Sequence, residues 1–211
     1  MKSIYDPPFI VKKIFGQFYW ETTNNKILLT FDDGPNAGTT EKILSKLSDL
    51  KIKALFFCAG NNIERQDGLA KEIISSGHVI GNHSFNHKVL TKLSKEELLS
   101  EINNFNKLLM EKYNYKVKYF RPPYGRINLR LRKILRETDM KCVMWNLLTY
   151  DYKKELKKVN FIINKYLSEN SIIVLHDSNK TKDIVVDSIK FIAETADKKG
   201  FIFGEPHECL K

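Results

Sequence analysis

The chain of 211 residues is 42% hydrophobic and 28% charged, an ordinary composition for a globular protein that excludes collagen-like repeats, coiled coils and intrinsic disorder. This length predicts one domain whose core needs no disulfide bonds. Lysine and arginine number 35 against 25 aspartates and glutamates, and the formal net charge of +10 suggests an anionic partner such as nucleic acid, a membrane surface or an acidic polymer.

Short apolar runs alternate with helical patterns after an N-terminal segment, residues 1–25, which we expect to pack on a domain of residues 26–211. Ser94 and Glu97 form a capping box at the start of a long helix. The predicted strands cover residues 26–31, 53–58, 78–81, 118–120, 141–145, 171–175 and 201–203. The other predicted helices cover residues 39–50, 67–76, 127–138 and 154–168, with a last one inside 183–199.

The predicted strands are apolar throughout and do not alternate with polar residues. Such strands are typical of a parallel sheet that helices cover on its faces, so an α/β fold is predicted. About seven strand–helix units fit either an open doubly wound sheet or a closed barrel. In both, functional side chains gather at the C-terminal ends of the strands.

Most of the basic excess lies in residues 101–150. Within residues 126–136, basic side chains alternate with apolar residues spaced three and four apart, which predicts an amphipathic helix with a basic outer face. These basic residues are Arg126, Arg130, Arg132, Lys133 and Arg136. Because the sequence has no zinc-finger, RNP or helix-turn-helix pattern, we interpret this face as solvated and predict no nucleic-acid partner.

The three cysteines, Cys58, Cys142 and Cys209, are odd in number and widely spaced, and we expect buried free thiols rather than disulfide bonds. The first residues contain no apolar stretch typical of a secretion signal, and no run approaches the ~20 apolar residues of a membrane span. We therefore expect no transmembrane segment and a cytoplasmic location for the chain as written, or an extracytoplasmic one if a leader has been removed. We also expect a monomer.

Ionisable side chains follow five of the predicted strands. Such convergence is unusual for a chain with only five histidines in 211 residues. The side chains are Asp32 and Asp33 after the first strand, His83 and His87 after the third, Arg121 after the fourth, Asp151 after the fifth and His176 after the sixth.

His83 and His87 are four residues apart, so a helical turn or loop points both imidazoles the same way. Two imidazoles and one carboxylate form a usual three-ligand set for Zn²⁺, and Asp33 supplies the carboxylate if the first and third strands are close. A bare pair of histidines at this spacing is more often a surface pair on a helix. The Asp-Asp-Gly-Pro turn of residues 32–35 favours the metal site instead.

Two adjacent aspartates repel each other when ionised, which suggests a division of labour: one carboxylate binds the metal and the other acts as a general base. Arg121, followed by two prolines, would either bind an anion or hold a carboxylate, and Asp151 is a candidate partner. His176 ends the most apolar strand. It is either a packed core histidine or the general acid that a leaving amine needs.

The motifs together resemble the NodB-homology polysaccharide deacetylases (carbohydrate esterase family 4). The resemblance runs from about residue 26 to residue 203. It implies a single-domain distorted (β/α) barrel of about seven parallel strands. It also implies metal-dependent removal of acetyl groups from N-acetylated or O-acetylated sugars, in chitin-like or peptidoglycan chains. The motifs are residues 30–35, His83-Ser-x-x-His87, Arg121-Pro-Pro-Tyr-Gly125 and the apolar run into His176-Asp177.

The resemblance also implies roles for the residues that match. Asp32 resembles the catalytic base, and Asp33, His83 and His87 resemble the metal ligands. Ser84 would steady the histidine loop. Zinc is the first expectation for the metal, with cobalt, nickel or manganese as alternatives.

A second group of roles concerns the surroundings of the base and the acid. Arg121 resembles the residue that orients the base, with Asp151 pairing it. Tyr124 occupies the position whose backbone N–H helps hold the oxyanion, and His176 that of the catalytic acid.

Two departures from the family pattern change the substrate pocket. The fourth motif ends in Asp151-Tyr152 rather than Asp-Trp, and Val174 stands where the family has leucine. Three alternatives remain: a hydrolase of small cyclic amides or ureides, a non-catalytic carbohydrate-binding relative, and a non-haem iron oxygenase.

Overall fold

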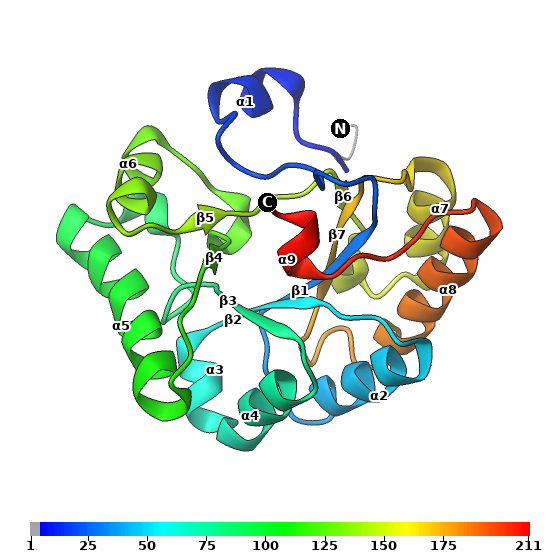
Figure 1. The fold of residues 1–211 in the computed structure, drawn as a ribbon, viewed down its shortest axis with the longest axis horizontal. Coiled ribbons are helices and arrows are strands. Elements are labelled where there is room, and N and C mark those ends of the chain that lie inside the picture. Colours follow the sequence, from blue (N-terminus) through cyan, green and yellow to red (C-terminus); the bar gives the residue numbers. More distant parts are fainter. Residues whose placement is uncertain (1–4) are drawn as a thin grey trace.

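The computed structural model describes residues 5–211, and in this part of the chain seven parallel strands form one sheet with the order β5-β4-β3-β2-β1-β7-β6 (Figure 1). The strands are β1 Leu28–Asp32, β2 Leu55–Cys58, β3 Val79–Asn82, β4 Tyr119–Phe120, β5 Lys141–Cys142, β6 Leu147–Leu148 and β7 Ile172–His176. The helices are α1 Phe9–Ile14, α2 Thr40–Leu50, α3 Gly60–Arg65, α4 Asp67–Ser75, α5 Lys95–Tyr113, α6 Leu129–Glu137, α7 Leu156–Tyr166, α8 Val185–Lys198 and α9 Pro206–Cys209. The predicted α/β fold with parallel strands is confirmed.

The sheet curls into a half-barrel with α2 to α8 around its outside (Figure 1). Among the described residues no strand pairing joins its two edges, β5 and β6. The N-terminal segment fills that gap: the carbonyl of Tyr5 accepts a hydrogen bond from the N–H of Leu148 at one edge, and Tyr19 bridges to Val143 at the other. Phe15, Phe18 and Trp20 of the same segment are buried in the main core.

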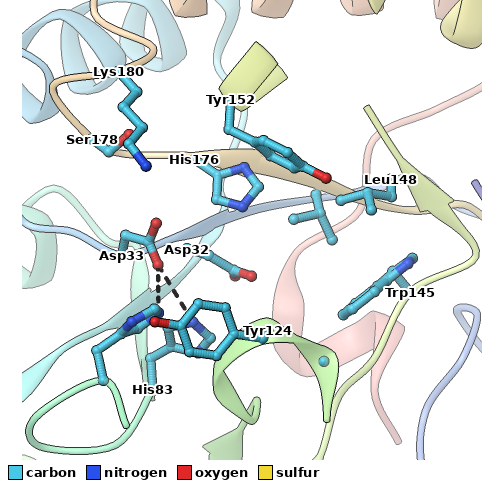
Figure 2. Close-up of a pocket in the computed structure, with 13 residues that line it drawn as sticks. Asp32, Asp33, His83, Tyr124, Trp145, Leu148, Tyr152, His176, Ser178 and Lys180 are labelled. Carbon is cyan, nitrogen blue, oxygen red and sulfur yellow. Dashed lines mark ion pairs between the residues drawn. The ribbon is translucent and has the colours of Figure 1, made fainter. Parts of the chain in front are cut away.

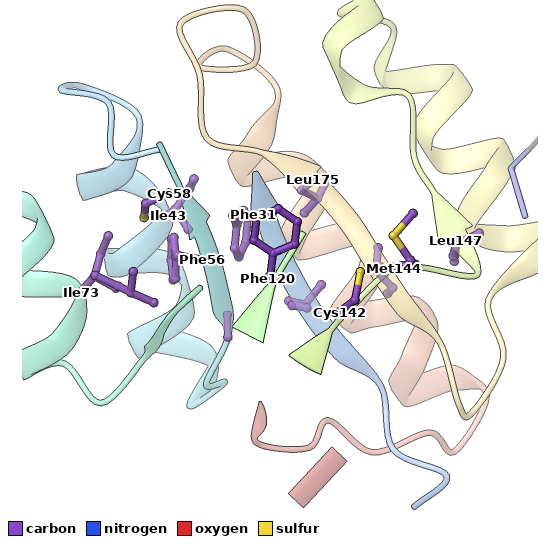
Figure 3. Close-up of a cluster of buried hydrophobic side chains, with 14 of the residues drawn as sticks. Phe31, Ile43, Phe56, Cys58, Ile73, Phe120, Cys142, Met144, Leu147 and Leu175 are labelled. Carbon is purple, nitrogen blue, oxygen red and sulfur yellow. The ribbon is translucent and has the colours of Figure 1, made fainter. Parts of the chain in front are cut away.

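Alternate residues of each strand point to opposite faces of the sheet, and this assigns them to two cores. Leu29 and Phe31 of β1 face outward into the large cluster between sheet and helices, part of which Figure 3 shows. Leu28 faces the barrel interior, where it packs in a smaller cluster with Cys209 and Leu210 of the C-terminal segment. The helix α9 and its neighbours close the barrel interior at the N-terminal ends of the strands. The polar side chains of the interior face lie at the C-terminal ends of the strands.

Most predicted elements are present with ends shifted by one to three residues, and the Ser94–Glu97 capping box at the start of α5 is confirmed. The predicted strand 201–203 is wrong. Phe203 forms only an isolated bridge with Ile27, because the chain turns into α9 soon afterwards. The short strand β6 and the helices α1, α3 and α9 were not predicted.

The expectations for the cysteines and for the basic helix are confirmed. Cys58, Cys142 and Cys209 are buried free thiols. The helix α6 buries Leu131, Ile134 and Leu135 and directs its arginines and lysine outward. In the described chain, no helix has both the length and the apolar character needed to cross a membrane.

Candidate functional site

A cavity of about 380 Å³ opens at the C-terminal ends of the strands (Figure 2). Its walls come from segments far apart in the chain, because the ends of parallel strands meet at one edge of the sheet. Most of the predicted site residues line it, namely Asp32, Asp33, His83, His87, Tyr124, Tyr152, Val174 and His176. The other two, Arg121 and Asp151, are fully buried directly behind it.

Asp33, His83 and His87 form a compact set of potential metal ligands, and their three ligand atoms lie within 4.8 Å of one another. Asp33 Oδ1 is 3.0 Å from His87 Nε2 and 3.6 Å from His83 Nε2, the contacts marked in Figure 2. Neighbouring ligands around a tetrahedral zinc ion with bonds near 2.0–2.2 Å are about 3.3 Å apart. The three side chains therefore fit a divalent metal.

The hydrogen bonds of His83 support the same interpretation. Its Nδ1 is 2.7 Å from the backbone carbonyl of Arg121. Because a carbonyl can only accept, Nδ1 carries the proton and Nε2 presents its lone pair toward Asp33. His87 is held from another side, with its ring edge-to-face against Tyr124 at 4.8 Å between centroids.

Electrostatics also fit a ligand role for Asp33. Burial disfavours its charged form, but the neighbouring imidazoles of His83 and His87 outweigh this effect and hold the pKa of Asp33 well below its ordinary range. Its backbone has a φ of 77°, a left-handed conformation that aspartate tolerates better than most residues.

The histidine loop is fastened to β3 and α5 by two side chains that the sequence analysis did not identify. Asn82 Oδ1 accepts the backbone N–H of Ser84 at 2.8 Å. The buried Glu101 of α5 accepts the backbone N–H of Asn86 at 2.7 Å and its side-chain amide at 2.8 Å. The expected steadying by the Ser84 hydroxyl is not seen, because Ser84 Oγ has no hydrogen-bond partner in the described structure.

Asp32 faces the cavity from the last position of β1 and is held by Arg121. Arg121 Nη1 donates to Asp32 Oδ1 at 2.7 Å and to Thr30 Oγ1 at 2.7 Å. Its Nε and Nη2 donate to the backbone carbonyls of Val143 and Met144. The guanidinium is fully buried, so these bonds leave it one orientation and define where the Asp32 carboxylate lies.

The predicted pair of Arg121 and Asp151 is wrong. Asp151 instead contacts His176: Oδ1 is 2.7 Å from His176 Nδ1, and Oδ2 accepts the His176 backbone N–H at 2.7 Å. The reason lies in the strand order. Asp151 follows β6, which pairs with the strand that ends at His176, whereas Arg121 lies on the far side of β1.

The proximity of Asp151 changes the titration of His176. Burial alone lowers the pKa of this imidazole, but the adjacent carboxylate of Asp151 outweighs burial and raises the pKa of His176 to about 9. His176 therefore carries a proton at neutral pH. Since Nδ1 is engaged with Asp151, Nε2 is the ring nitrogen available to the cavity.

The turn between β1 and α2 is held by Asp177. The Thr40 hydroxyl donates to Asp177 Oδ2 at 2.6 Å, and the side-chain amide of Asn36 donates to the Asp177 carbonyl at 2.7 Å. A Cβ on Gly34 would lie 2.3 Å from Asp177 Oδ2, so a larger residue there would have to displace the Asp177 carboxylate. Burial raises the pKa of Asp177 to about 7, although the hydrogen bond from Thr40 opposes the shift.

Tyr124 lies in the 3₁₀ turn Pro123–Gly125 with a φ of 60°. Its backbone N–H makes no hydrogen bond among those described, so it remains available to a ligand oxygen. The turn packs tightly against Trp145, because a Cβ on Gly125 would lie 2.2 Å from the indole ring. Tyr152 forms the opposite wall, edge-to-face with His176 at 5.1 Å between centroids.

Besides Gly125, which neighbours the predicted Tyr124, four residues of the cavity wall were not predicted: Trp145, Leu148, Ser178 and Lys180. Trp145 ends the predicted strand 141–145, so its place at a strand end was the available signal. Leu148 belongs to the unpredicted β6, and Ser178 and Lys180 follow His176 in a loop with no periodic pattern. Figure 2 shows Lys180 reaching toward the cavity, and it has no ion-pair partner among the described residues.

Comparison with known proteins gives a consistent result. The model of the polysaccharide deacetylase family matches residues 20–143. A peptidoglycan-N-acetylglucosamine deacetylase of Bacillus cereus is 32% identical over 201 residues, which cover 93% of this chain and 94% of the relative. The peptidoglycan-N-acetylglucosamine deacetylase PgdA of Listeria monocytogenes is 32% identical over 169 residues, or 79% of this chain. The match spans only about a third (35%) of the length of PgdA.

The fold is shared with a solved member. The crystal structure of the Bc1960 peptidoglycan N-acetylglucosamine deacetylase, in complex with 4-naphthalen-1-yl-N-oxidanyl-benzamide, superposes with a TM-score of 0.89. Its sequence is 29% identical, and the superposition covers 97% of each chain.

Proposed function

This chain belongs to the polysaccharide deacetylase family, and from that membership we propose that it is a metal-dependent hydrolase that removes acetyl groups from N-acetylated sugars of a glycan. The observation that carries the proposal is the arrangement in one cavity of three potential metal ligands, a carboxylate held by a buried arginine and a protonated histidine. Each of these has a separate task in amide hydrolysis.

Asp33, His83 and His87 would hold the metal, for which we propose zinc, since two imidazoles and a carboxylate suit this ion; cobalt, nickel and manganese are the alternatives. A metal bound there supplies a Lewis acid that polarises the acetyl carbonyl and makes water more acidic. The bond from His83 Nδ1 to the Arg121 carbonyl keeps the ligand nitrogen in its productive tautomer.

Asp32 acts as the general base and takes the proton of the water that attacks the acetyl carbon. The ion pair with Arg121 holds Asp32 Oδ1, so the carboxylate cannot rotate away from the cavity. Asp32 Oδ2 accepts no hydrogen bond from the described side chains. That oxygen is left for the water.

His176 acts as the general acid. Its Nε2 donates a proton to the sugar nitrogen as the C–N bond breaks, and Asp151 holds the ring from behind and keeps it protonated. The backbone N–H of Tyr124 binds the oxygen on which negative charge develops.

The walls of the cavity suit a sugar. Trp145, Tyr152 and Leu148 offer apolar and aromatic surface for the ring face and the acetyl methyl group, and Val174 lies on the interior face of β7. For the glycan we propose peptidoglycan, which the relatives named above act on according to their names, with chitin-like chains as the alternative.

Acetate release tests the proposal directly. The protein is stripped with a chelator, single divalent metals are added back, and acetate is measured from peptidoglycan fragments and from chitooligosaccharides. We expect no release from the stripped protein and the fastest release with zinc. Full activity after stripping would overturn the metal assignment. Hydrolysis of cyclic amides without acetate release from either glycan would overturn the proposed reaction.

A further inference from the structure

One surface of the molecule has no part in the proposed chemistry. It consists of α1 and the outer side of α6, and we call it the α1–α6 surface. Arg132 joins the two helices, since its Nη1 donates to the carbonyl of Ile14 at 3.2 Å. Its members are Phe9, Ile10, Lys13 and Ile14 on α1 with Leu129, Arg132, Lys133 and Arg136 on α6.

The apolar side chains of this surface are unusually exposed. Phe9 is 79% exposed, Ile10 65%, Leu129 61% and Ile14 52%. The helix α1 buries none of its side chains, although half of its six residues are large exposed hydrophobics. A short helix at the surface of a globular protein ordinarily turns such residues toward the core. Large exposed hydrophobic residues gathered on two joined helices are typical of an interaction site.

The charges of the α1–α6 surface are mainly positive. Lys13, Arg132, Lys133 and Arg136 lie on the same two helices as the apolar residues, and no described carboxylate lies within ion-pair distance of any of them. Leu129, Arg132, Lys133 and Arg136 line a shared hollow, where Glu137 is the acidic residue. The α1–α6 surface therefore combines exposed apolar side chains with an excess of cations.

We propose that the α1–α6 surface docks on an anionic lipid bilayer. Burial in the apolar part of a bilayer stabilises exposed phenylalanine and isoleucine, and anionic head groups attract the neighbouring lysines and arginines. Both features therefore match one partner. A water-soluble polyanion would neutralise the cations but leave the apolar side chains in water. A second copy of this chain would bring the two sets of cations together.

The orientation of α6 fits this role. Its first residue, Leu129, follows the Pro123–Gly125 turn of the cavity after a few residues. Because α6 connects the parallel strands β4 and β5, the chain runs along it from the cavity end of the barrel toward the other end. Docking through α1 and α6 would therefore leave the cavity open at the edge of the bilayer, where a glycan next to the membrane could enter.

Vesicle co-sedimentation tests the proposal without any measurement of activity, so its result is independent of the proposed reaction. The full chain is mixed with vesicles of phosphatidylcholine alone and with vesicles of equal parts phosphatidylcholine and phosphatidylglycerol. We expect binding to the second kind only, weakening as salt is raised.

Two variants separate the contributions. F9Q/I10Q/I14Q removes the apolar tips, and K13Q/K133Q/R136Q removes cations, and none of these six side chains is buried. We expect each variant to lower vesicle affinity by roughly tenfold or more. M110Q/I202Q, which removes exposed apolar side chains elsewhere, is the matched control and retains full binding.

Three results would overturn the proposal. The first is equal binding to both kinds of vesicle. The second is full binding by F9Q/I10Q/I14Q, which would identify a purely electrostatic partner. The third is dimeric elution of the unchanged chain in size-exclusion chromatography with monomeric elution of F9Q/I10Q/I14Q, which would assign the surface to self-association.

Discussion

Asp32 and Asp33 are neighbours in the chain but have different partners. Asp33 lies between two imidazoles, while Asp32 receives its hydrogen bond from the buried Arg121. This difference assigns one carboxylate to the metal and the other to proton transfer. Substitution of each residue can therefore separate metal binding from turnover.

Asp32→Asn keeps the shape of the side chain but removes its basicity. We expect this variant to bind metal like the unchanged protein and to lose acetate release by about 10²–10⁴-fold, the usual contribution of a general base. His83→Ala, in contrast, should fail to retain the metal, and its acetate release should fall as a consequence. Metal content after gel filtration and the rate of acetate release are the two measurements. An Asp32→Asn protein with unchanged turnover would remove Asp32 from the role of base.

The contact between Asp151 and His176 predicts a shift in titration. In the metal-free protein the imidazole of His176 has a pKa of about 9, because the Asp151 carboxylate outweighs burial. Asp151→Asn removes the largest effect that raises this pKa and leaves only the weaker attraction of Asp33 and Asp32 to oppose burial, so the pKa of His176 should fall well below 9. NMR titration of the histidine ring protons measures it, and the exposed His207 serves as internal reference.

The same shift has a consequence for stability. Because the pKa of His176 is higher in the folded than in the unfolded chain, its protonation stabilises the fold fully below about pH 6.5, and this stabilisation is lost as the pH rises toward 9. Asp151→Asn should weaken that part of the pH dependence. A His176 pKa that stays at about 9 in Asp151→Asn would contradict the pairing of Asp151 with His176.

At the scale of elements, the histidine loop depends on α5. Glu101 is buried and holds both the backbone and the side chain of Asn86, one residue before His87. Glu101→Ala removes both hydrogen bonds, which costs about 1–3 kcal/mol of unfolding free energy, and loosens the loop. We expect metal affinity to fall by about 10–100-fold, as for other residues that position ligands.

Titration against a chromophoric chelator measures this affinity. Glu111→Ala is the matched control, since Glu111 lies on the exposed side of the same helix and should leave metal affinity unchanged. Equal affinities for the two variants would show that α5 does not position His87.

Alanine substitutions at two glycines, one in the turn after β1 and one on α4, should have opposite effects on stability. Gly34→Ala places a methyl group against the Asp177 carboxylate, and overpacking of this kind destabilises by about 1–3 kcal/mol. Gly68→Ala lies on α4 with no atom near the added carbon, and alanine in a helix should stabilise by about 0.5–1 kcal/mol. Urea denaturation of both variants measures the difference. A stabilised Gly34→Ala protein would mean that the turn is looser than the structure shows.

At the scale of the whole molecule, the long buried strands and amphipathic helices were predictable because their patterns are local. The site residues were predictable because they follow strands directly, as Asp33 and His176 do. The partners of the charged side chains were not predictable. Asp151 contacts His176 because β6 lies next to β7, and the strand order cannot be inferred from the spacing of residues in the sequence. Two-residue strands such as β6 are too short to carry a periodic signal.

The metal site joins segments that only the folded chain brings together. Asp33 comes from the end of β1 and the two histidines from the loop after β3, so the unfolded chain offers no preformed site. A metal that binds only the folded protein stabilises it by about 2.7 kcal/mol when its free concentration is a hundred times the dissociation constant. We therefore expect zinc to raise the melting temperature of the unchanged protein and of His207→Ala, whose imidazole is exposed on α9. The melting temperature of His83→Ala should not respond. If zinc raised it as much as in the unchanged protein, the ion would be bound somewhere other than the Asp33, His83 and His87 site.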